Sequence, residues 1–238
     1  MAKLLVSPRS VEEAIEAVRG GADIIDVKNP REGSLGASFP WVISAVRRAV
    51  PRSIEVSATL GDAPCLPGTM SLAAAGALQA GADIVKVGLK FTGRSRATEL
   101  MSMVVKAARL VKPTSVVVAA SYGDAHEVGA LDPMDVPQVA YESGCEVAML
   151  DTAVKDGRSL LDHLSRRELR RFVDEAHSLG LKAALAGSLK LEHIPACLEL
   201  GADIIGVRGA ACEGGDRNTG RITARKVREL ASIVHSTL

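Results

Sequence analysis

The chain has 238 residues, of which 47% are hydrophobic and only 3% aromatic, and its formal net charge is +1. This length suits a single domain of the eightfold β/α-barrel kind, typically ~250 residues, and the scarcity of aromatic residues predicts a core of Val, Ile and Leu. The balanced charge, without a long basic or acidic block, argues against nucleic acid or a membrane surface as a partner.

Signals for targeting, disulfides and metals are also lacking. No stretch approaches the ~18 uninterrupted apolar residues of a membrane span, and the apolar run near the N-terminus is too short for a signal sequence, so we expect a cytoplasmic protein. The four cysteines are widely spaced, and neither they nor the five histidines show the spacing of a metal site. We therefore expect small, buried cysteines and no bound metal.

Sequence motifs typical of β-strands alternate along the chain with segments of helical periodicity. The strand phrases are residues 4–7, 21–28, 54–57, 81–88, 116–119, 144–151, 183–186 and 201–208. The predicted helices are residues 11–19, 41–49, 71–80, 98–111, 134–142, 166–179, 191–200 and 224–234. Strands that alternate with helices over short connections indicate a parallel sheet.

Four of the strand phrases are copies of one another. Residues 21–28 read Gly-Ala-Asp-Ile-Ile-Asp-Val-Lys, and residues 81–88, 201–208 and, more loosely, 144–151 repeat them. Each step of about 60 residues leaves room for two strand–helix units of ~30 residues. Eight such units favour a single (β/α)8 TIM barrel over residues 1–238, and a doubly wound open sheet is the alternative.

Side chains alternate between the two faces of a strand, so the sixth and eighth residues of each copy share a face with the fourth. This face begins apolar and becomes charged toward the strand end, whereas the fifth and seventh residues are apolar throughout. Its charged residues are Asp26, Lys28, Lys86, Asp151 and Arg208. A packed barrel holds such groups if they act at its C-terminal, catalytic end, and a buried ion-pair network without chemistry is the alternative.

The two lysines suggest amine chemistry. Lys28 and Lys86 are close by strand position, and both a neighbouring cation and partial desolvation lower the pKa of an ammonium group. The neutral amine is the nucleophile that forms a Schiff base with a carbonyl. Asp26 and Asp151 would hold whichever lysine stays protonated and relay protons. Lys155, just past the sixth strand phrase, either reaches the same pocket or lies on a surface loop.

The last two strand ends suggest phosphate. Gly187 and Ser188 follow the seventh strand phrase, and Arg208 and Gly209 end the eighth, where barrels often bind phosphate through backbone N–H groups. Arg208 can chelate phosphate oxygens. Residues 213–221 form either a second loop for an anionic ligand or a flexible turn. No Gly-x-Ser-x-Gly elbow and no Gly-x-Gly-x-x-Gly after a strand is present, which argues against hydrolases and nicotinamide enzymes.

Five long sequence motifs occur together in one known family. They are residues 20–30, 33–37, 39–41, 148–153 and 206–212. They resemble the (5-formylfuran-3-yl)methyl phosphate synthase family of methanofuran biosynthesis, and the resemblance runs from Leu4 to about Arg221. It implies that two molecules of glyceraldehyde 3-phosphate are joined, with loss of phosphate and water, into a furan aldehyde phosphate. It also implies that Lys28 forms the Schiff base, that Lys86 accepts a proton, and that no metal or organic cofactor takes part.

Without the family resemblance, the residues themselves leave two other functions open. A generic Schiff-base aldolase would share Lys28 and the phosphate loops but would release a linear sugar phosphate. A non-catalytic sensor of phosphosugars would keep the loops without needing two inward lysines. The expected partner in each case is a small phosphorylated molecule, in enzymes a phosphorylated aldehyde, and a homo-oligomeric assembly is compatible with the sequence.

Overall fold

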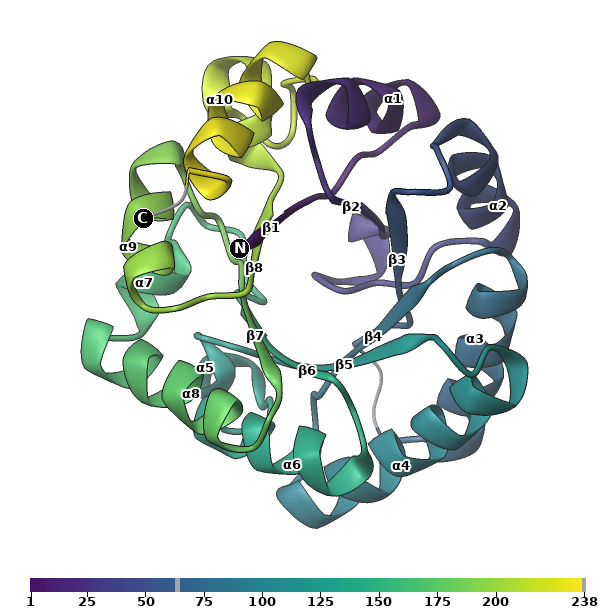
Figure 1. Ribbon diagram of the computed structural model, residues 1–238. Coiled ribbons are helices and arrows are strands. Elements are labelled where there is room, and N and C mark those ends of the chain that lie inside the picture. The colour runs from purple at the N-terminus through teal and green to yellow at the C-terminus, as the bar shows by residue number, and fades with distance from the viewer. Residues whose placement is uncertain (63–64, 237–238) are drawn as a thin grey trace.

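Eight parallel strands form a closed barrel in which each strand pairs with the next and β8 returns to β1 (Figure 1). The computed structural model describes residues 1–62 and 65–236. The strands are β1 (Lys3–Val6), β2 (Ile24–Val27), β3 (Glu55–Thr59), β4 (Ile84–Gly88), β5 (Val116–Tyr122), β6 (Val147–Asp151), β7 (Lys182–Leu185) and β8 (Ile204–Val207). The predicted (β/α)8 barrel is confirmed, and the open sheet is wrong.

Helices surround the barrel. The main ones are α1 (Val11–Gly20), α2 (Pro40–Ala49), α3 (Pro67–Gln79), α4 (Arg94–Val111), α6 (Val136–Ser143), α8 (Arg166–Ser178), α9 (Ile194–Glu199) and α10 (Ala224–Val234). The predicted helices 134–142 and 191–200 each begin with a short 3-10 turn, η2 (Pro133–Asp135) and η3 (Leu191–His193). Short helices that the periodicity did not predict are α5 (Ala125–Val128), α7 (Leu160–His163), η1 (Pro30–Glu32), η4 (Gly209–Ala211) and η5 (Glu213–Gly215). Within the described residues, no helix has both the length and the apolar character needed to cross a membrane.

The repeated phrase explains how each helix passes into the next strand. Its first glycine, as in Gly21 and Gly81, has a positive φ of 97° and 109°, which a residue without Cβ adopts at low cost after a helix. Its acidic third residue ties neighbouring strands together. Leu4 donates its N–H to Asp23 at 2.7 Å, and Val56 donates to Asp83 at 2.9 Å. The first three residues of the repeat therefore stabilise the N-terminal end of the barrel.

Strand side chains separate into two apolar layers. Ile25 and Val27 belong to the larger cluster between the strands and the helices. Ile24 and Leu5 belong to a smaller cluster inside the barrel, together with Met149. The predicted alternation is confirmed, and the charged residues that share the face of Ile24 therefore point into the barrel.

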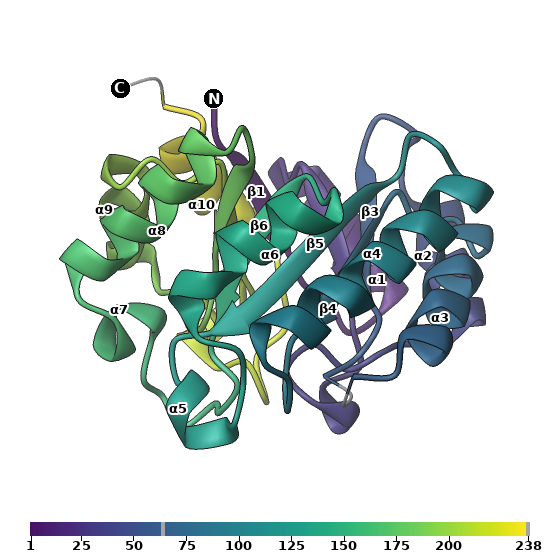
Figure 2. The ribbon, with the colours of Figure 1, turned by 90° about the horizontal axis from the view of Figure 1, so that it is seen from below.

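The site lies at the end of the barrel opposite the chain termini. Figure 2 shows both termini at the upper end, whereas the loops that carry α5 and α7 lie at the lower end, beyond the carboxyl ends of β5 and β6. The loop after β2 covers part of this mouth. Leu35 is fully buried against the interior layer, and the Ser34 hydroxyl donates to the Thr152 carbonyl at 2.9 Å. The remaining opening is lined by residues from β1, β2 and β6 to β8 and the loops that follow them.

Candidate active site

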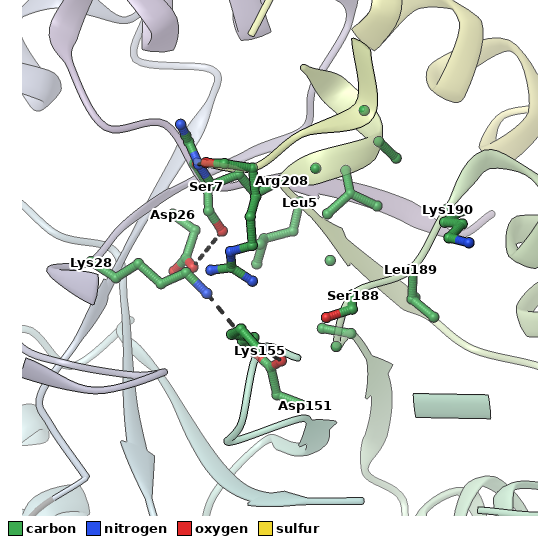
Figure 3. Close-up of a pocket in the computed structure, with 18 of the residues that line it drawn as sticks. Leu5, Ser7, Asp26, Lys28, Asp151, Lys155, Ser188, Leu189, Lys190 and Arg208 are labelled. Atoms are coloured by element: carbon green, nitrogen blue, oxygen red, sulfur yellow. Dashed lines mark hydrogen bonds and ion pairs between the residues drawn. The ribbon is translucent and has the colours of Figure 1, made fainter. Parts of the chain in front are cut away.

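A cavity of about 280 Å³ opens at the C-terminal ends of the strands. Figure 3 shows the Lys28 side chain extending across it toward Asp151. The predicted site residues in its wall are Asp26, Lys28, Asp151, Lys155, Gly187, Ser188, Arg208 and Gly209. Lys86 does not line the cavity. The structure therefore brings the predicted residues together, with Lys86 deeper in the barrel than the others.

Lys86 and Asp26 form a buried ion pair beneath the cavity. The Lys86 ammonium nitrogen lies 2.7 Å from an oxygen of Asp26, and Ser7 donates its hydroxyl to the other oxygen at 3.0 Å. Burial lowers the pKa of Lys86, and the attraction of Asp26 only partly offsets this. Burial alone would raise the pKa of Asp26, but Lys86 and Lys28 hold it below its usual value. Asp26 is therefore the group that connects Lys86 with the cavity.

The depth of Lys86 has a signal in the sequence. Lys86 and Asp26 hold the sixth position of their copies of the repeat, and Lys28 holds the eighth. Two residues along a strand correspond to ~6.6 Å. The position of each residue along its strand therefore places Lys86 one layer below Lys28. The alternation of side chains between the two faces of a strand does not by itself distinguish these layers.

Asp151 holds the other two lysines. Its carboxylate lies 2.7 Å from the Lys155 ammonium nitrogen and 3.9 Å from that of Lys28. Burial alone would raise the pKa of Asp151, but Lys155 and Lys28 keep it far below its usual range, so the group is ionised. Lys155 also donates to the carbonyl and the hydroxyl of Thr152, at 2.6 and 3.0 Å. Of its two expected positions, Lys155 takes the one in the pocket.

Lys28 is the least constrained of the three lysines. It makes no hydrogen bond to any described residue, whereas Lys86 is held by Asp26 and Lys155 by Asp151 and Thr152. The single ion pair of Lys28, with Asp151, is long at 3.9 Å. The Lys28 amine is therefore free to meet a carbonyl carbon in the cavity, whereas Lys155 is held by hydrogen bonds.

Arg208 is already engaged by protein groups. Its guanidinium donates to Glu13 at 2.9 Å, to the Ser7 carbonyl at 2.9 Å and to the Arg217 carbonyl at 3.1 Å, and its side chain is 6% exposed. Arg208 therefore forms the buried ion pair that the sequence left as an alternative, while it also lines the cavity, and its expected binding of phosphate stays a prediction. Its partner Glu13 reaches the end of β8 from the first turn of α1.

The loops after β7 and β8 form an electropositive edge of the cavity. Gly187 has a φ of 101°, and a Cβ there would lie 2.7 Å from the Thr152 nitrogen, so the tight turn requires glycine. Ser188 has a φ of 49°, and its N–H makes no hydrogen bond within the described residues. Arg217 lines the cavity without an ion pair to any described carboxylate, and burial lowers its pKa. The sequence indicated Arg217 only as part of residues 213–221.

Metal-ligating residues do not gather at this site or elsewhere in the described chain. No group of three or more His, Cys, Asp and Glu side chains is placed to hold an ion in residues 1–62 and 65–236. The cysteines are buried, and burial raises the pKa of Cys197 to about 11 and that of Cys145 to about 12. The thiols of Cys145 and Cys197 are therefore protonated and act as small apolar groups.

The fold and the site define a (β/α)8-barrel protein with a lysine- and carboxylate-lined cavity where enzymes of this fold carry their active sites. Comparison with known families then identifies the relationship. The model of the family described as 4-HFC-P synthase matches residues 4–231, and the chain belongs to this family. The resemblance stated from the sequence is confirmed.

Relatives named (5-formylfuran-3-yl)methyl phosphate synthase cover nearly the whole chain. The protein from Methanocaldococcus jannaschii is 59% identical over 231 residues, 97% of this chain and 98% of its own length. That from Methanothermobacter thermautotrophicus is 56% identical over 234 residues, 98% and 99% of the two chains. These names make the chain a relative of enzymes.

Solved structures share the fold at lower identity. A 3-hexulose-6-phosphate synthase superposes with a TM-score of 0.68 at 24% identity, over 97% of this chain and 99% of that chain. KGPDC from Streptococcus mutans gives a TM-score of 0.69 at 13% identity, over 98% and 97% of the two chains. At these identities the likeness establishes the barrel fold alone.

Proposed function

We propose that the protein is a (5-formylfuran-3-yl)methyl phosphate synthase of methanofuran biosynthesis that uses Lys28 as a Schiff-base nucleophile. The family and its relatives' names support the reaction. Two molecules of glyceraldehyde 3-phosphate supply all atoms of the product, with one phosphate and two waters released. The observation that carries the proposal is the Lys28 amine, which reaches into the cavity with one long ion pair and no hydrogen bond in the described residues, whereas Lys155 beside it is held by Asp151 and Thr152.

The first step is imine formation. The Lys28 nitrogen adds to the aldehyde carbon C1 of one substrate molecule, and the carbonyl oxygen leaves as water. The resulting protonated imine withdraws electrons and acidifies the hydrogen on C2. Asp151, ionised beside Lys28, stabilises the positive nitrogen of this intermediate.

Removal of the C2 proton leads to phosphate loss. The electron pair left on C2 forms an enamine and then expels the phosphate from C3, which leaves C3 as the nucleophilic end of an enol. We assign the acceptance of the proton to Lys86 acting through Asp26: the Asp26 carboxylate lines the cavity and takes the proton first, and Lys86, whose pKa burial lowers, exchanges protons with it across their ion pair. Lys155 keeps Asp151 in place through its own ion pair.

The furan skeleton determines the next bond. C3 of the imine-bound molecule must join C2 of the second molecule, which requires a carbonyl at C2 and hence a proton shift from C2 to C1 in that molecule. The carbonyl oxygen takes up a proton as the bond forms. Ring closure and two dehydrations give the furan, and the water released on imine formation is consumed when the product is hydrolysed from Lys28.

The phosphate of the first molecule is assigned to the edge made by Gly187, Ser188 and Gly209, with Arg217 as its cation. Free N–H groups in a glycine turn and an arginine without an ion pair in the described residues both favour a dianion there. Arg208 contributes positive potential while its guanidinium binds Glu13.

Product analysis tests the proposal. Purified protein is incubated with glyceraldehyde 3-phosphate, the furan is identified by mass and ultraviolet absorbance, and phosphate release is counted. We expect one phosphate for each furan aldehyde formed. A linear six-carbon bisphosphate without phosphate release would indicate the generic aldolase, and binding without any conversion would indicate the sensor.

A further inference from the structure

A second groove lies beside the cavity. It has a volume of about 800 Å³, within the ~300–1,000 Å³ range of ligand sites. Its walls come from the loop after β1, the loop after β2, α2 and the segment after β8, and they include Arg9, Lys28, Asn29, Arg31, Phe39 and Asn218. Lys28 and Asn218 also line the cavity, so the groove and the cavity meet at the residue to which the Schiff base is assigned.

The groove has the charge of an anion site. Arg9 and Arg31 are exposed on its walls, and neither forms an ion pair with a carboxylate within residues 1–62 and 65–236. Arg9 donates to the carbonyl and the side-chain oxygen of Asn218, at 2.9 and 3.4 Å, which fixes it on the ridge between the groove and the cavity. The groove's carboxylate, Glu32, is engaged by the Asn29 amide at 3.2 Å.

We infer that this groove binds the second triose phosphate, with its phosphate on Arg9 and Arg31 and its carbonyl end directed at Lys28. The inference rests on the proposed function, because that reaction needs two phosphorylated substrates at one amine. The first phosphate is assigned to the cavity edge made by Gly187, Ser188 and Gly209, and the groove supplies the site for the second. The phosphate held in the groove is the one that remains in the product.

The test separates the two substrate molecules. In Arg9→Gln and Arg31→Gln, the substrate concentration that gives half-maximal borohydride-trapped adduct on Lys28 should stay unchanged, because the first molecule binds in the cavity. The KM for furan formation should rise about tenfold or more in each variant, as expected for the loss of a charge-assisted contact. Arg9→Lys, which keeps the charge, should recover part of the loss.

Arg52→Gln is the matched control, since Arg52 is also exposed and unpaired with any described carboxylate but lies before β3, at the other end of the barrel. Kinetics of the groove variants equal to those of this control would overturn the inference. A parallel loss of trapping and turnover would also overturn it, because the groove would then serve the first molecule.

A binding measurement keeps the inference separate from the proposed reaction. Calorimetry with inorganic phosphate should show two sites in the unaltered protein and one in the Arg9→Gln, Arg31→Gln double variant. A single site in both proteins would contradict the inference even if furan forms. Absence of both adduct and furan with two phosphate sites intact would instead contradict the proposed function.

Discussion

Individual side chains in this site differ in how firmly the protein already holds them. Arg208 shares a buried ion pair with Glu13, and burial alone would raise the pKa of Glu13, whereas Arg208 lowers it. Removing one partner of a buried pair leaves an uncompensated charge, which typically costs ~3–5 kcal/mol. Arg208→Ala should therefore lower the melting temperature strongly, and denaturant unfolding measures the loss. A fully stable variant would show that the pair is dispensable.

Arg217, in contrast to Arg208, is not held by an ion pair within the described residues. Because it lines the cavity without an ion pair to a described carboxylate, its contacts are free for substrate. Arg217→Gln should raise KM by about one to two orders of magnitude, corresponding to ~1.5–3 kcal/mol for a charge-assisted hydrogen bond, and leave the melting temperature nearly unchanged. Steady-state kinetics and thermal unfolding of the same variant decide this. An unchanged KM would place the phosphate elsewhere.

At the scale of elements, the loop after β2 shapes the mouth of the barrel. Leu35 is fully buried against the interior layer, and the Thr59 hydroxyl donates to the Gly36 carbonyl at 2.6 Å. Leu35→Ala should destabilise the protein by ~2–5 kcal/mol because it leaves a cavity. The control is Leu110→Ala in α4, since Leu110 is 80% exposed and should change stability little. Equal, small effects in the two variants would show that the loop is not packed in solution.

The strands and main helices could be predicted because their signals are local. The repeat and the alternation of side chains identified the strands, but β5 continues to Tyr122, three residues beyond the predicted strand at 116–119. Helix α3 begins at Pro67, four residues before the periodicity, since proline suits the first turn. Helix α5 spans Ala125–Val128, too short for helical periodicity to be detected.

The whole molecule depends on ionised carboxylates. Asp26, Asp83, Asp151 and Glu13 all have a pKa below the ordinary value, owing to the lysines, arginines and N–H groups that face them. A carboxyl whose pKa is lowered by folding stabilises the protein above its unfolded pKa of about 4 and loses this contribution as the pH falls. The melting temperature should therefore drop between about pH 5 and pH 3. A constant melting temperature over this range would contradict the assignment.

Asp83 provides a matched variant for this pH dependence. Its carboxylate accepts from the Val56 N–H at 2.9 Å and pairs with Arg47 and Lys112. Asp83→Asn should lower stability at pH 7, and the difference from the unaltered protein should shrink toward pH 3, because the Asp83 carboxyl of the unfolded chain takes up a proton there and folding must release it. A difference that is independent of pH would mean that the amide fails for steric reasons.

The charged residues of the site could be predicted only where their position along a strand determines which way the side chain points. Lys28, Lys86, Asp26 and Asp151 were found because parity is a property of single strands. The partner of Arg208 was not found, because Glu13 is 195 residues away and meets it only when the barrel closes. The position of Arg217 in the cavity wall depends in the same way on how its loop folds back over the mouth.

The identity of the nucleophile is the central claim and can be measured directly. The protein is reduced with borohydride in the presence of glyceraldehyde 3-phosphate, digested, and mapped by peptide mass spectrometry, with Lys28→Arg as the control. The account predicts a substrate-dependent adduct on Lys28 that is absent from the variant. An adduct found only on Lys86 or Lys155, or furan formation by Lys28→Arg at the full rate, would contradict it.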